Sequence, residues 1–185
     1  MALSKIDVAN MLTGATPVAN GGTALTSGFV NGSALGIDTW RITSNFQGNT
    51  DPVTANWERD DTYGNGVSNG MTESSGIFTF PSTGFWLVTA HFQFSGDSGD
   101  NIYVLLNINV STNGGTGYSD AAFGYTNLDG SGEYAKTSIQ KVLDVTDTSN
   151  FRVSFTTSSQ DNNHYVQTDT NQNASYAIFQ RLGDT

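Results

Sequence analysis

"GIFTFPSTGFWLVTAHFQFSG", residues 76–96, contains two apolar segments separated by a four-residue break. Large apolar residues alternate along both segments, as in strands that turn one face toward a protein core. Pro81 fixes its φ angle and has no backbone N–H to give to a sheet, whereas Gly84 tolerates backbone angles that other residues avoid. We therefore predict a short strand at 76–80 and a long strand at 84–95, joined as a hairpin.

The rest of the chain also indicates an all-β protein. Only 13% of its 185 residues are charged and 21 are Gly, so good helix formers are scarce and turn formers are abundant. Apolar alternation and spacing predict further strands at 101–111, 118–126, 134–145, 150–157 and 174–182, a strand in "TWRITSNF" and a short one in "TANWERDD". The segment "AKTSIQKVLDV" also fits a helix, but its β-branched residues favour a strand. Together these segments predict a two-sheet antiparallel jelly roll.

Charge and composition exclude several classes of partner and site. The formal net charge is −10, which repels nucleic-acid phosphates and anionic membranes. The chain has no Cys, so thiolate chemistry and thiolate metal sites are excluded, and no cofactor is predicted. No segment approaches the roughly 20 apolar residues of a membrane-spanning helix. The start of the chain lacks the apolar core of a signal peptide, so we expect no ordinary secretion.

The first part of the chain differs in character from the remainder. Residues 1–36 are rich in Gly and small residues, with Phe29 as their single aromatic, and they cannot build a core of their own. A few residues near the start, Ser4–Leu12, could form one or two helical turns. We predict an N-terminal arm at 1–36 and a jelly-roll head at 37–185.

Two segments of the head resemble a known family. The run from Trp57 to Phe94 is similar to the first half of the globular head of complement C1q, in the tumour necrosis factor-like superfamily. The matching positions of its Gly-x-Phe-x-x-Pro-x-x-Gly-aromatic phrase are Gly76, Phe78, Pro81, Gly84 and Phe85. The apolar run "ASYAIFQRLG" near the end of the chain resembles the closing strand of that family. The resemblance covers about residues 38–185 and implies a jelly-roll head. The calcium ligands usual in the family are not recognisable here, and no metal is predicted.

The resemblance also implies a homotrimer, because heads of this family pack an aromatic-rich sheet face around a three-fold axis. Such a face would be an unfavourable apolar patch on a monomer, and closed cyclic symmetry buries it. The candidates for the trimer interface are Phe92, Tyr103, Phe151, Tyr176 and Phe179. Each of them could instead fill the core, because alternation alone does not say which face of a strand is which.

The arm carries a second resemblance. "GATPVANGGT", residues 14–23, is similar to a phrase in fibre and appendage proteins of tailed phages. The residues that carry the likeness, and that we take as anchoring candidates, are Pro17, Val18, Asn20, Gly21 and Gly22. A flexible linker is the alternative explanation of such a Gly-rich segment. If the likeness holds, residues 1–36 anchor the head to other virion proteins of the capsid or tail.

Nothing in the sequence supports catalysis. The two histidines, His91 in an apolar strand and His164 in a polar segment, lack the neighbours of a Ser-His-Asp triad or a metal pair. We expect His91 to be a packed sheet residue and His164 to be solvated. The chain is therefore expected not to be an enzyme.

The expected function is that of a structural virion protein. The sequence leaves two roles open, host adhesion through a surface glycan or protein and capsid decoration or cementing. Tyr and Asn in Gly-rich segments resemble adaptable binding loops, and the candidates for adhesion are Tyr63, Asn65, Tyr118 and Tyr125. Ordinary turn chemistry is the alternative. A free soluble trimeric binding module of lectin-like or ligand-like type is the alternative to a virion protein.

Overall fold

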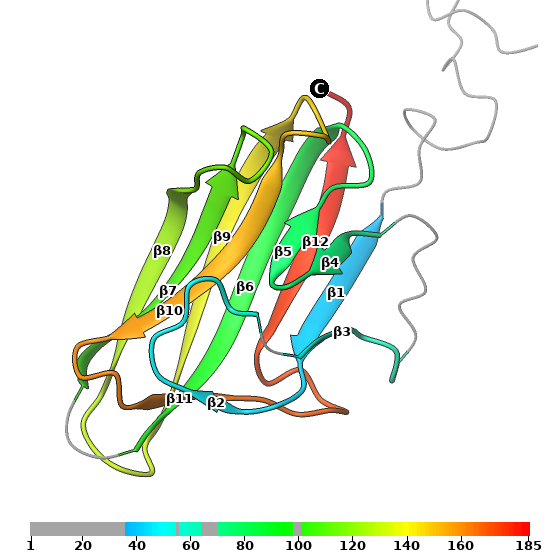
Figure 1. The fold of residues 1–185 in the computed structure, drawn as a ribbon. Helices are drawn as coiled ribbons and strands as arrows, with labels where there is room; N and C mark the ends of the chain where they lie inside the picture. The colour runs from blue at the N-terminus through cyan, green and yellow to red at the C-terminus, as the bar shows by residue number, and fades with distance from the viewer. Residues whose placement is uncertain (1–35, 55, 64–69, 98–100) are drawn as a thin grey trace, which may run out of the picture. The chain divides into compact units, whose positions relative to one another are not determined.

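The computed structural model describes residues 36–185 apart from 55, 64–69 and 98–100. The described part of the chain contains β-strands and no helix (Figure 1). The strands are β1 (Ile37–Ile42), β2 (Phe46–Gln47), β3 (Trp57–Arg59), β4 (Thr72–Ser74), β5 (Ile77–Thr79), β6 (Gly84–Gly96), β7 (Asn101–Ser111), β8 (Ser119–Leu128), β9 (Tyr134–Val145), β10 (Arg152–Ser159), β11 (His164–Gln167) and β12 (Tyr176–Gly183). The predicted arm at 1–36 and the helical turns at 4–12 lie outside the described residues, except for Gly36.

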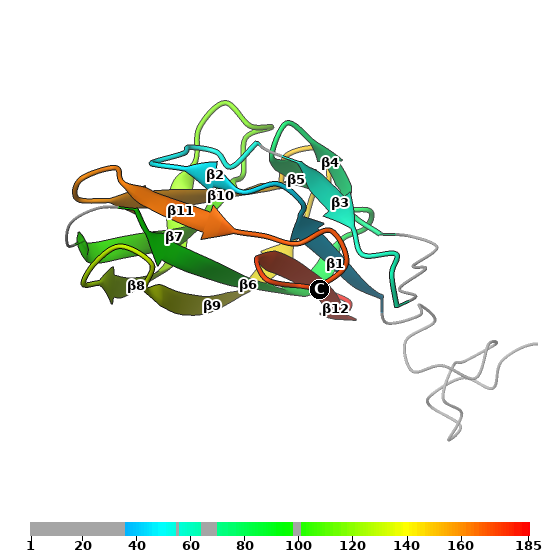
Figure 2. The same ribbon diagram turned by 90° about the horizontal axis from the view of Figure 1, so that it is seen from below.

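The strands form two antiparallel sheets. One sheet has seven strands, with β6 at its centre. β6 pairs with β9 along one side and with β12 and β11 along the other. β12 also pairs with β1, which pairs with β3, and β11 also pairs with β2. The other has five strands in the order β4-β5-β10-β7-β8. Figure 2 shows the two layers from below, with β8 of one sheet beside β9 of the other. This arrangement confirms the predicted two-sheet jelly roll.

The opening stretch has a different role from the one we predicted. β5 pairs with β4 and β10 in the five-stranded sheet, whereas β6 belongs to the seven-stranded sheet. The hairpin prediction is therefore wrong, and the break at 80–83 carries the chain from one sheet to the other. Alternation correctly indicated a buried face for each segment, but it contains no information about which strand is the partner.

The space between the sheets is filled largely by aromatic rings. Phe78 of β5 and Phe179 of β12 come from opposite sheets, and their ring centroids are 4.9 Å apart. Trp57 of β3 meets Phe78 edge to face, with 5.1 Å between the ring centroids. Such pairs contribute about 0.5–1.5 kcal/mol beyond the burial of their area. The aromatic core therefore fixes how the two sheets lie against each other.

A buried charge network closes one side of the seven-stranded sheet. Arg41 of β1 is 1% exposed, and its guanidinium donates to Asp60 Oδ1 at 2.8 Å and to Asp61 Oδ1 at 2.7 Å. A buried cation needs such partners because its desolvation costs several kcal/mol. Next to it, Asp38 accepts hydrogen bonds from the side chains of Trp40 and Arg59. Both networks join β1 to the segment around β3 and so hold the edge of the sheet in place.

Candidate functional site

The outer face of the seven-stranded sheet carries an apolar surface. The β6 residues Phe85 and Leu87 point away from the core, because their neighbours Trp86 and Val88 are buried in it. Residues paired with or next to them in the sheet extend the surface onto β9, β12 and β1. We call this surface the apolar sheet face and define it by Ile37, Phe85, Leu87, Val142, Tyr176 and Ile178. It joins four strands without interruption by a loop.

His91 and Tyr176 form a stacked pair on the apolar sheet face. Their ring centroids are 4.7 Å apart, and His91 Nδ1 lies 2.7 Å from the Ser138 hydroxyl oxygen. The Lys136 ammonium lies 5.1 Å from the centre of the Tyr176 ring. Burial, and secondly the positive charge of Lys136, lower the pKa of His91 below its ordinary value of 6.5. The His91 ring is therefore uncharged at neutral pH.

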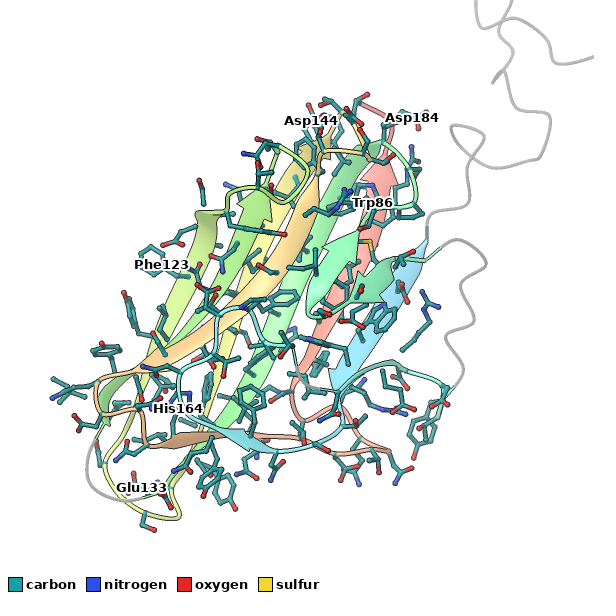
Figure 3. The ribbon with its side chains drawn as sticks, viewed as in Figure 1. Trp86, Phe123, Glu133, Asp144, His164 and Asp184 are labelled. Carbon is teal, nitrogen blue, oxygen red and sulfur yellow. The ribbon has the colours of Figure 1, made fainter. Side chains whose placement is uncertain are left out.

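The five-stranded sheet has an exposed aromatic cluster on its own outer face. Phe123 and Tyr125 of β8 are each 59% exposed, and Phe123 projects away from the ribbon in Figure 3. Tyr125 meets Phe123 and Tyr103 of β7 edge to face, with ring centroids 5.5 Å and 5.9 Å apart. We call Tyr103, Phe123 and Tyr125 the β7–β8 aromatic patch.

A shallow hollow adjoins the β7–β8 aromatic patch. It measures about 410 Å³ and is lined by Ile102, Tyr125, Thr126, Asn127 and Asp129. The Asn127 amide donates to Asp129 Oδ1 at 2.8 Å, and the backbone N–H of Asp129 donates to Glu133 Oε2 at 2.9 Å. These bonds fix the orientation of the acceptor groups beside the ring of Tyr125.

A second hollow, of about 620 Å³, lies beside the Arg41 network. Its lining includes Arg41, Trp57, Glu58 and Asp61. The charge of Arg41 is already balanced by carboxylates, including Glu58 Oε2 at 3.4 Å from its Nε. This hollow therefore offers no uncompensated cation to an anionic ligand.

The structure separates the five candidates for the trimer interface. Tyr176 lies on the apolar sheet face. Phe92 and Phe179 are 0% exposed in the core between the sheets, so the interface assignment of these two residues is wrong. Phe151 is half-buried against the core, and Tyr103 lies on the other sheet in the β7–β8 aromatic patch. Four residues of the apolar sheet face were not among the candidates, because the outer faces of β6 and β12 mix apolar and polar residues: Phe85, Leu87, Val142 and Ile178.

The adhesion candidates do not form one set of loops. Tyr63 is exposed in the turn after β3, and Tyr118 lies immediately before β8. Tyr125 lies within β8, as the strand predicted at 118–126 implied, so its assignment to an adhesion loop is wrong. Asn65 lies outside the described residues, as do the anchoring candidates Pro17, Val18, Asn20, Gly21 and Gly22.

The histidine positions bear on possible catalysis. His164 was expected to be solvated, but it is 0% exposed, with its Nδ1 2.8 Å from the Ser159 hydroxyl oxygen. It belongs to β11, which pairs with β6, so this polar segment is part of the sheet. Among the described residues, no three His, Cys, Asp or Glu side chains are placed to hold a metal ion together. The same residues contain no helix long and apolar enough to cross a membrane.

Comparison with known proteins identifies the fold. No protein-family model matches the chain, and no curated protein matches its sequence. Among solved structures it is similar to the Eiger TNF of S. frugiperda, with a TM-score of 0.58, 12% identity, and coverage of 83% of this chain and 96% of that one. It is also similar to murine APRIL, with a TM-score of 0.59, 11% identity, and coverage of 80% and 100%. The head is therefore a tumour necrosis factor-like jelly roll.

Proposed function

We propose that this chain forms a homotrimeric, non-catalytic head of a tailed-phage virion protein, anchored through residues 1–36 and serving in host adhesion. The observation that carries the proposal is the apolar sheet face. A binding head needs an assembly surface and a separate recognition surface, and the two outer sheet faces can supply one each.

The apolar sheet face has the character of an assembly surface. No outward side chain on the central strands β6 and β12 carries a charge at neutral pH, in a chain with a net charge of −10. Charges lie only at the margin of this face on β9, where Asp144 is the strand partner of Phe85 and Lys136 lies beside Tyr176. Apolar surface that spans several strands is unfavourable in water and marks interaction sites. A closed ring of identical copies buries such a surface. Three copies are proposed by analogy with the family that the sequence and the fold resemble.

The virion assignment is supported by the arm phrase "GATPVANGGT" at 14–23. Host adhesion is preferred because the β7–β8 aromatic patch leaves a recognition surface on the sheet that does not form the trimer. Capsid decoration is the second candidate, and it is favoured by the short connection: only residues 24–36 separate the arm phrase from β1, too few for a fibre shaft.

The test of this function uses phage particles and the isolated head. We expect a chain lacking residues 1–36 to fold but to be absent from purified particles, because the anchor has been removed. We expect the same head, added to susceptible cells before infection, to block adsorption. Normal incorporation of the truncated chain would contradict the anchor. Unchanged adsorption, together with fragile particles when the protein is missing, would support decoration instead. A secreted chain found apart from particles would support a free binding module.

A further inference from the structure

We propose that the β7–β8 aromatic patch and the adjoining hollow bind a neutral oligosaccharide. This inference rests on the proposed adhesion function and specifies the class of ligand that the head recognises.

The local sequence forces the aromatic rings outward. In "AFGYT", Gly124 faces the other sheet, where an added Cβ would lie 2.7 Å from Ile139 Cγ2 and 2.9 Å from Thr137 Cγ2. Only Gly fits at this position, because β8 lies close against β9. Phe123 and Tyr125 on either side must then point away from the core. The exposure of these rings is a consequence of the register of β8 and not of a mobile loop.

The charges around the patch exclude an anionic ligand. β7 and β8 contain no Lys or Arg, and their single charged residue is Asp120. Asp129 and Glu133 follow in the turn between β8 and β9. Sulfated, sialylated or phosphorylated ligands would meet these carboxylates without a cation to bind them. The complementary ligand is therefore neutral and donates hydrogen bonds.

A sugar fits both features of this surface. The C–H face of a pyranose ring packs on an aromatic ring, whose electron-rich face attracts the weakly positive hydrogens. Its hydroxyl groups can donate to the amide oxygen of Asn127 and to the carboxylate of Asp129, which has acceptor sites beyond the one used by Asn127. The 410 Å³ hollow has the size of a small-ligand site and lies directly beside Tyr125.

A protein partner is less well matched by area. A specific protein interface buries about 800 Å² on each side. Three aromatic side chains provide about 450–750 Å² even when completely covered. The patch is thus small for a stable protein complex.

The test measures binding of the full-length chain to an array of immobilised neutral, sulfated and sialylated oligosaccharides. We expect binding to neutral oligosaccharides. Phe123→Ala and Tyr125→Ala should each weaken it by about tenfold or more, in line with the effect of removing a stacking ring. Tyr134→Ala is the matched control, because it removes an exposed aromatic ring on β9, in the other sheet, that does not line the hollow. It should bind like the unchanged chain.

Two further measurements keep the result interpretable. Thermal melting of each variant tests whether the fold is kept, and light scattering tests whether the number of chains per oligomer is kept. Binding only to anionic oligosaccharides, binding to none of them, or equal binding by the Phe123 and Tyr125 variants would overturn the proposal. Loss of the trimer in Phe123→Ala would also overturn it, since the patch would then be an interface between copies. The virion assignment is tested independently by the particle experiment above.

Discussion

At the scale of single residues, His164 shows how the fold fixes the protonation state of a side chain. The imidazole is buried against Phe94 and contacts the Ser159 hydroxyl, and its Nε2 has no hydrogen-bond partner among the residues that the structure describes. Burial lowers the pKa of His164 from 6.5 to about 4. The neutral ring is therefore part of the core, and its protonation works against the folded state.

His164 makes the stability of the head dependent on pH. Below pH 6.5 the unfolded chain takes up a proton at this residue, whereas the folded chain does so only near pH 4. The free energy of unfolding should therefore fall as the pH decreases from about 6.5 to 4, by about 3 kcal/mol in total from this group. Urea unfolding at pH 7 and at pH 4.5 measures the loss.

A variant isolates the contribution of His164 from that of the carboxylates. His164→Gln has no imidazole to protonate, so the loss of stability between pH 7 and pH 4.5 should be smaller than in the unchanged chain. His91→Gln is the control, because it removes an imidazole from the sheet surface and leaves His164 in place. If both variants lost the same unfolding free energy between pH 7 and pH 4.5, His164 would not be the source of this pH dependence.

At the scale of elements, the corner between β5 and β6 is held by a tight backbone contact. Gly84 has a φ of 133°, and an added Cβ would collide with the carbonyl oxygen of Gly183. The indole of Trp86 closes the corner by donating to the carbonyl oxygen of Ser82 at 3.1 Å. The chain can pass from one sheet to the other here because Gly84 has a positive φ angle, which residues with a Cβ atom rarely adopt.

Gly84→Ala should destabilise the head by about 2–4 kcal/mol, because it combines backbone strain with a backbone collision. Gly130→Ala is the matched control: none of the described residues lies within 4 Å of its added Cβ, so its effect should stay within about 0.5 kcal/mol. Chemical denaturation of both variants gives the comparison. Equal stabilities would show that the corner relaxes at little cost.

The strands themselves could be predicted well from sequence. Alternation placed β6, β7 and β9 to within a residue, and strand rather than helix is confirmed for "AKTSIQKVLDV" in β9. The pairing could not be predicted in the same way. The hairpin at 76–96 was wrong because a strand's own residues record which face is buried but not which strand lies beside it.

The candidate surfaces were predictable only in part. Tyr176 lies on an outer sheet face, whereas Phe92 and Phe179 lie in the core. The sequence could not separate the three, because both faces of β6 and β12 carry large apolar residues. Knowledge of the pairing resolves this ambiguity. A signal for the β7–β8 aromatic patch was present in the sequence, since a lone Gly between two aromatic residues in a strand indicates a close approach on one face.

At the scale of the whole head, the two sheets have different outer surfaces. The seven-stranded sheet has the apolar sheet face, and the five-stranded sheet has the β7–β8 aromatic patch. Because the sheets are stacked, these surfaces face in opposite directions. Assembly through the first would leave the second accessible on every copy. The three weak sugar sites of one trimer would then act together, which raises the effective affinity without any new contact.

The proposed trimer can be tested by placing one charge on the apolar sheet face. Leu87 lies on the outer face of β6, half-exposed in a single chain, so Leu87→Asp should leave the fold intact. In the trimer the same change would bury three unpaired carboxylates at a cost of several kcal/mol each. We expect light scattering to give the mass of three chains for the unchanged protein and of one chain for Leu87→Asp at micromolar concentration. Phe123→Asp, on the other sheet, is the control and should remain a trimer. A monomeric unchanged protein, or a Leu87→Asp variant that stays assembled, would show that the apolar sheet face is not the surface that joins the copies.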